Sequence, residues 1–155
     1  MCIRDRVREK NLPYQNVKKI AQKILDLAKP YQAKVLINEN EKLALDIGAD
    51  GVHYPSHSLI QLKHRPDFSI CGTSCHNLEE LMIAQDLKMS FAVLSPVQKT
   101  ESHPHADPIG WEFFSECANK LDMPIYALGG LSQENLATSW RHGGHGIAMQ
   151  RAIWE

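Results

Sequence analysis

Two adjacent glycines, Gly129 and Gly130, have the type and spacing that point most directly to chemistry in this 155-residue chain. They end a short apolar run, and a second apolar run at residues 146–149 follows after one helix length. Paired glycines at the carboxyl end of a buried strand let backbone N–H groups approach an anion closely. The loops after the last two strands of (β/α) barrels often bind phosphate. We therefore expect a barrel-type enzyme that binds a phosphorylated small molecule; the alternative is a plain tight turn.

A sheet must position these glycines, and short apolar runs supply its strands. Nearly continuous hydrophobicity, without alternation, is typical of strands buried on both faces of a parallel sheet. The expected strands are residues 35–37, 51–54, 69–72, 91–94, 125–128 and 146–149. Amphipathic segments between them predict helices, the first beginning near Gln15 and the second ending at Gly48. Asn77 and Ser132 are expected to begin later helices. This repeated alternation of strands and helices indicates right-handed parallel crossovers in one domain.

Composition excludes several classes of protein. Hydrophobic residues make up 43% of the chain and charged residues 23%, and the net charge is −1. We therefore expect no nucleic-acid binding by this domain. No apolar run approaches the roughly 20 residues of a membrane span, so we expect no membrane partner. The four cysteines form no disulfide framework, which favours a cytoplasmic protein with reduced thiols.

Residues 1–6, Met-Cys-Ile-Arg-Asp-Arg, look foreign to the rest of the chain. They resemble the translated end of an adaptor used in sequencing libraries. We interpret them as a non-native segment joined to a domain at residues 7–155; the alternative is a natural, charged and mobile N-terminus.

Several blocks in order resemble the thiamine phosphate synthase and thiazole tautomerase superfamily. They cover about residues 7–154, and they lie at 7–10, 37–40, 48–53, 72–76, 95–100, 127–131 and 146–148. The resemblance implies a (β/α)₈ TIM barrel in the α/β class, here incomplete and lacking the first βα unit. Residues 100–104 with Gly110 and Trp111 resemble the branch fused behind Nudix hydrolases of the 8-oxo-dGTP diphosphatase type. A Nudix domain in the same full-length chain is therefore expected.

The resemblance also implies phosphate contacts at polar residues along the chain. Arg8 and Lys10 match a diphosphate-binding pair, which strand alternation would turn to one face; the alternative is a charged, frayed terminus. Thr100 and Ser102 stand where hydroxyls bind diphosphate oxygens, and His103 replaces the family's lysine there. Two histidines here, His103 and His105, could also suggest zinc, but no further ligand spacing completes such a site.

Further residues match the family's substrate and metal contacts. Asn38 matches a contact to the pyrimidine or diphosphate, although Asn38 or Asn40 could instead cap a helix. Glu39 stands at the position of a Mg²⁺-binding aspartate, and its side chain is longer than that of aspartate. Ser58 stands at the position of the second Mg²⁺-binding aspartate and supplies no charge. Ser74 matches a substrate-contacting serine. His76 matches the tautomerase general acid/base, and both are expected just after a strand; the alternative for His76 is part of a helix N-terminus.

The resemblance implies a transferase of thiamine biosynthesis. It would join a thiazole phosphate to a hydroxymethylpyrimidine diphosphate, with Gly129 and Gly130 holding the thiazole phosphate. The alternatives are a thiazole tautomerase-like isomerase with His76 as proton shuttle, or a noncatalytic ligand-binding or regulatory domain of a Nudix hydrolase.

Overall fold

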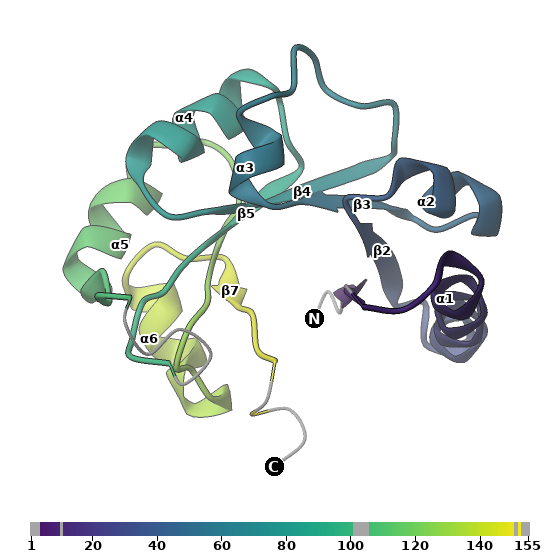
Figure 1. The fold of residues 1–155 in the computed structure, drawn as a ribbon. Coiled ribbons are helices and arrows are strands. Elements are labelled where there is room, and N and C mark those ends of the chain that lie inside the picture. Colours follow the sequence, from purple (N-terminus) through teal and green to yellow (C-terminus); the bar gives the residue numbers. More distant parts are fainter. Residues whose placement is uncertain (1–3, 10, 101–105, 151, 153–155) are drawn as a thin grey trace.

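A computed structural model of the chain describes residues 4–9, 11–100, 106–150 and 152. Strands and helices alternate through this part of the chain (Figure 1). The strands are β1 (Arg4–Val7), β2 (Lys34–Asn38), β3 (Gly51–Tyr54), β4 (Ile70–Cys75), β5 (Phe91–Leu94), β6 (Ile125–Ala127) and β7 (Gly146–Ile147). The helices are α1 (Tyr14–Ala28), α2 (Glu41–Ile47), α3 (Ser56–Leu59), α4 (Leu78–Asp86), α5 (Gly110–Ala118) and α6 (Leu136–Arg141), with 3₁₀ turns at Lys29–Tyr31 and Gln133–Asn135.

The described strands form one seven-stranded parallel sheet in the order β1-β2-β3-β4-β5-β6-β7. Figure 1 shows the sheet curled into an open half-barrel, with the helices on its outer side. The prediction of an α/β, barrel-like parallel fold is confirmed. The missing first βα unit and the foreign origin of residues 1–6 stay predictions, and β1 begins at Arg4, inside that segment.

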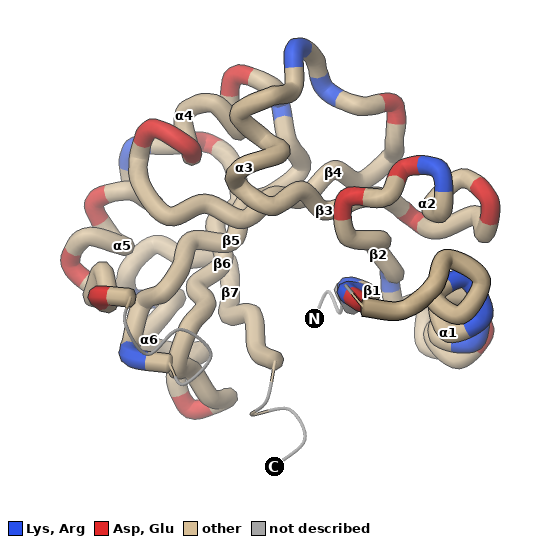
Figure 2. The backbone as a smooth tube through the Cα atoms, in the orientation of Figure 1, with Lys and Arg blue, Asp and Glu red and all other residues tan. Residues whose placement is uncertain are grey.

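Both faces of the strands are buried, as their continuous hydrophobicity predicts. In β2, Val35 and Ile37 belong to the large core between the sheet and the helices, whereas Leu36 faces the other way. Leu36 packs in a smaller inner cluster with Phe91 and Val93. Lysine, arginine, aspartate and glutamate residues occur mostly along the outer helices and loops (Figure 2). Among the described helices, none is long and apolar enough to cross a membrane.

Helix ends follow local hydrogen bonding. Asn40 caps α2, because its side-chain oxygen accepts from the Leu43 N–H at 2.9 Å, and Gly48 ends that helix with φ +67°. The cap belongs to Asn40 and not to Asn38, which settles the alternative left open by the sequence. Asn77 caps α4 in the same way, accepting from the Glu80 N–H at 2.9 Å. The N-terminal end of α3 carries no capping side chain, and the sequence pattern did not predict this short helix.

Two strand boundaries differ from the prediction. Strand β4 runs to Cys75, so Ser74 lies within the strand and pairs with Val93; the prediction that it follows the strand is wrong. The polar residues Thr73 and Ser74 concealed this extension. Thr73 Oγ1 donates to the Tyr54 carbonyl at 3.0 Å, and on the other face of the strand Ser74 Oγ lies 2.9 Å from His53 Nε2. Strand β1 ends at Val7, so Arg8 lies beyond it. Lys10 lies outside the described residues, so the expected alignment of Arg8 with Lys10 on one face stays a prediction.

Candidate active site

Parallel pairing brings the candidate residues to one end of the sheet. Asn38 ends β2, Ser74 lies near the end of β4, and Arg8 and Gly129 follow β1 and β6. Because every neighbouring pair of described strands is parallel, the carboxyl ends of these strands share one rim. This is the rim at which barrel enzymes place their active sites.

Inside the half-barrel, a polar cluster connects β1 with β3 and β4, neither of which pairs with β1. His53 of β3 is 3% exposed, and its Nε2 lies 2.9 Å from Ser74 Oγ of β4. Arg6 of β1 donates from Nη1 to the same oxygen over 3.4 Å. The Ser74 hydroxyl can therefore accept from Arg6 and donate to His53. The sequence analysis did not select His53 or Arg6, because nothing in a single sequence shows which side chains meet inside a barrel.

Charge in this cluster is asymmetric. Burial, followed by the positive charges of Arg6 and Arg8, holds the pKa of His53 well below its ordinary value of 6.5, so the ring is neutral. Burial, followed by the charge of Arg8, lowers the pKa of Arg6 to about 10. Arg6 thus stays cationic at neutral pH. Two guanidinium groups near one rim create a positive field that suits a phosphorylated ligand.

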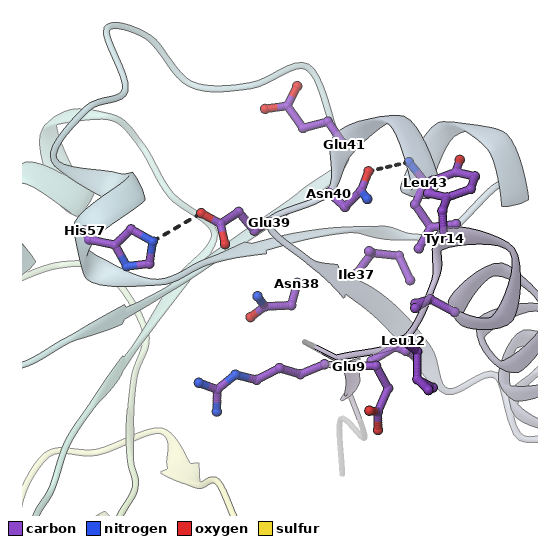
Figure 3. Close-up of a pocket in the computed structure, with 13 residues that line it drawn as sticks. Glu9, Leu12, Tyr14, Ile37, Asn38, Glu39, Asn40, Glu41, Leu43 and His57 are labelled. Atoms are coloured by element: carbon purple, nitrogen blue, oxygen red, sulfur yellow. Dashed lines mark hydrogen bonds and ion pairs between the residues drawn. The ribbon is translucent and has the colours of Figure 1, made fainter.

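An open cleft of about 870 Å³ lies between the ends of β1 and β2 and the helices α1 and α2. Arg8, Asn38 and Glu39 line it with apolar residues that include Leu12 and Ile37. Figure 3 shows Asn38 and Glu39 on the wall of the cleft, whereas the Asn40 side chain points to the backbone N–H of Leu43, from which it accepts a hydrogen bond.

Glu39 adopts a left-handed conformation, φ +62°, directly after β2. Its Oε1 accepts a short hydrogen bond from Ser58 and lies 3.3 Å from His57 Nε2 (Figure 3). Within the described residues, no group of three or more His, Cys, Asp or Glu side chains is arranged to hold a metal ion. Glu39 therefore offers one carboxylate. That number fits Mg²⁺ only where the phosphate oxygens of a substrate complete the ligand set.

His76 is the first residue after β4 and is exposed to solvent. Its Nδ1 lies 2.8 Å from the Ser95 carbonyl oxygen, which can only accept, so Nδ1 carries the hydrogen. In the neutral ring this leaves the lone pair on Nε2. His76 also donates its backbone N–H to Glu80 Oε2 at 2.7 Å, so it does lie at the helix N-terminus as well.

Gly129 and Gly130 form the turn after β6 with φ values of +105° and +65°. Gly129 is buried and Gly130 is exposed. The Gly129 carbonyl oxygen accepts a hydrogen bond from the Gln98 N–H in the loop after β5. In the described part of the chain, no hydrogen bond uses the N–H of either glycine. Thr100 is half-buried at the end of the same loop, and Ser102 lies outside the described residues.

Comparison with known proteins agrees with this arrangement. Residues 6–153 match the TMP-TENI family, described as thiamine monophosphate synthase. A putative thiamine-phosphate synthase 2 of Aquifex aeolicus is 40% identical over 145 residues, covering 92% of this chain and 77% of the relative. The thiamine-phosphate synthase of Clostridium novyi is 31% identical over 151 residues, covering 95% and 74%.

A solved structure gives the same result in three dimensions. The thiamine phosphate pyrophosphorylase from Pyrococcus furiosus superposes with a TM-score of 0.77 at 25% identity, over 96% of this chain and 71% of that one. The family match spans the strands and the rim that carry the candidate site. The chain therefore belongs to the thiamine monophosphate synthase family.

Proposed function

We propose that this chain is a thiamine-phosphate synthase of thiamine biosynthesis. It would join a thiazole phosphate to a hydroxymethylpyrimidine diphosphate, with release of diphosphate. The observation that carries the proposal is the position of the Gly129–Gly130 turn, Ser74 and Arg8 along the same rim of a sheet of this family. Such a rim can hold two phosphorylated groups at once.

Each group has a separate task in this reaction. Arg8, with Lys10, Thr100 and Ser102, would stabilise the negative charge that builds up on the leaving diphosphate. The N–H groups of Gly129 and Gly130 would hold the thiazole phosphate, so that the ring nitrogen faces the pyrimidine carbon. The fixed position of both substrates lowers the entropic part of the barrier.

The polar cluster inside the half-barrel supports the pyrimidine side. Ser74 is held between Arg6 and His53, which fixes its hydroxyl before a substrate arrives. Asn38 on the cleft wall would bind the pyrimidine or its diphosphate. When bound, Mg²⁺ would neutralise diphosphate charge. Glu39 is the residue that would hold it, together with substrate oxygens.

The test is direct synthesis. The chain is incubated with both substrates and Mg²⁺, and thiamine phosphate and diphosphate are measured separately. The proposal expects the two products in equal amounts, and a loss of about 100-fold in kcat/KM for Arg8→Gln, since one stabilising cation contributes a few kcal/mol to such a transition state. A folded chain that binds both substrates and forms neither product would contradict it.

One observation favours a second function, thiazole isomerisation. The Ser95 carbonyl fixes the His76 tautomer, so that Nε2 can take a proton. In a metal-free isomerisation assay, His76→Gln should abolish turnover while Asn77→Ala, at the neighbouring helix cap, keeps it. Equal rates in the two variants would remove this candidate. Tight binding of thiazole phosphate without either turnover would indicate a binding module, for which the upstream Nudix domain stays a proposed setting.

A further inference from the structure

The loop after β5 is hydrogen-bonded to the glycine turn along its backbone. The Val97 N–H donates to the Leu128 carbonyl at 2.8 Å, and the Gln98 N–H donates to the Gly129 carbonyl at 3.0 Å. These two bonds lie just beyond the paired ends of β5 and β6. The conformation of the turn therefore depends on where this loop lies.

The two backbones also touch without any side chain between them. A Cβ on Gly129 would lie 2.7 Å from Pro96 Cα, and a Cβ on Gly130 would lie 2.2 Å from the Lys99 carbonyl oxygen. Because no space separates loop and turn, a displacement of the loop must displace the turn.

One side chain ties this pair of loops to the core. The partners of the Gln98 amide assign its orientation: the nitrogen lies 3.1 Å from the Gly130 carbonyl oxygen, to which it donates, and the oxygen lies 3.3 Å from Trp111 Nε1, from which it accepts. Only this amide orientation satisfies both partners. Trp111 belongs to α5, and its ring packs edge-on against the fully buried Phe114, with centroids 5.6 Å apart. Gln98 thus connects an exposed turn to a rigid part of the molecule.

We propose that Gln98 is a positioning residue for phosphate binding, because its amide bridges the Gly130 carbonyl to the Trp111 indole and so fixes the direction of the turn's N–H groups. The proposal deepens the proposed function and rests on it. Gln98 itself does not touch the ligand. Thr100 lies two residues further along the same loop, so the bridge also sets the spacing between the thiazole phosphate and the diphosphate.

The test compares three variants with one control. Gln98→Leu removes both bonds, Gln98→Glu keeps an acceptor for Trp111 but loses the donor to Gly130, and Trp111→Phe removes only the indole donor. Gln61→Leu, at an exposed glutamine in another loop, is the matched control. Binding of thiazole phosphate is measured by calorimetry and the steady-state constants by the synthase assay, after circular dichroism confirms folding.

For Gln98→Leu, we expect the Kd and KM of thiazole phosphate to rise about tenfold, as for loss of one useful hydrogen bond, with kcat within about twofold. Gln98→Glu should be at least as weak, Trp111→Phe should lose less, and Gln61→Leu should match the wild type. Unchanged thiazole phosphate binding in Gln98→Leu, with the wild type binding normally, would overturn the proposal. So would a Gln98→Glu variant that binds like the wild type.

A second measurement needs no ligand. Hydrogen exchange of the amide at position 98, which donates to the Gly129 carbonyl, reports whether the turn is held. We expect exchange at position 98 to be about tenfold faster in Gln98→Leu than in Gln61→Leu, after correction for the intrinsic rates of the two residue types. Equal exchange in the two variants would overturn the inference, whether or not the wild type binds thiazole phosphate. Failure of the wild type to bind thiazole phosphate would instead count against the proposed function.

Discussion

The neutral, buried imidazole of His53 should make the free energy of unfolding depend on pH. The folded-state pKa lies well below the ordinary 6.5, chiefly because burial disfavours the cation. Below about pH 6.5 the unfolded chain therefore binds a proton that the folded chain rejects. Stability is lost as pH falls, by up to about 1.4 kcal/mol per pH unit.

The size of the effect follows from this difference. Between about pH 7 and pH 5.5, protonation of one histidine of pKa 6.5 in the unfolded chain amounts to roughly 1.3 kcal/mol. Asp46 and Asp50 do not interfere, because hydrogen bonds and nearby lysines hold their pKa below the ordinary 3.8. The stability that Asp46 and Asp50 contribute is fully present above the ordinary pKa of 3.8, and it is lost only as the pH falls through their lower folded-state pKa.

Urea unfolding of the wild type, His53→Gln and His64→Gln at several pH values measures the effect. His64 is exposed and serves as the matched control. We expect the stability gap between wild type and His53→Gln to shrink by roughly 1.3 kcal/mol from about pH 7 to pH 5.5. If His53→Gln does not fold, NMR of the wild-type ring should show that its pKa lies well below 6.5. A constant gap, or a His53 ring that titrates near 6.5, would refute the reasoning.

Three further variants test separate parts of the structure. Asn40→Ala should lower the free energy of unfolding in urea by about 1 kcal/mol, because α2 loses its cap. An unchanged free energy of unfolding would show that the cap does not stabilise the protein. Gly130→Ala should weaken thiazole phosphate binding at least tenfold by calorimetry, because its Cβ would meet the Lys99 carbonyl at 2.2 Å; normal affinity would contradict a fixed turn. Tyr54→Phe removes the 2.8 Å hydrogen bond to Glu41 and should lower the free energy of unfolding in urea by about 1–2 kcal/mol, without altering its dependence on pH between about pH 5.5 and 7. A changed pH dependence in this variant would mean that the titration does not belong to His53 alone.

The fold was largely predictable because its determinants are local. Val35, Leu36 and Ile37 form a continuous apolar run, and the structure buries this run on both sides of the sheet. The glycines at 48, 129 and 130 take the left-handed conformations that made them signals of turns. Cys71 and Cys75 are buried in the core as free thiols, which agrees with the absence of a disulfide framework in the sequence.

The interior of the barrel was not predictable in the same way. Ser74 seemed to follow a strand, because a serine does not show in sequence that a hydroxyl will bond to His53. Arg6 seemed to belong to a foreign terminus, yet its side chain reaches Ser74. Gln98 gave no signal, because its two partners come from separate elements. Such contacts join positions far apart in the chain, and periodicity carries no information about them.

The measurement that tests the central claim most directly is a titration of ¹⁵N-labelled protein with thiazole phosphate. If the carboxyl-end rim binds the phosphoryl group through main-chain amides, the Gly129 and Gly130 signals should shift in a saturable manner. Gly48 and Gly143, which precede β3 and β7 at the opposite end of the sheet, should not. Saturable shifts at Gly48 or Gly143 with Gly129 and Gly130 unmoved would contradict the account.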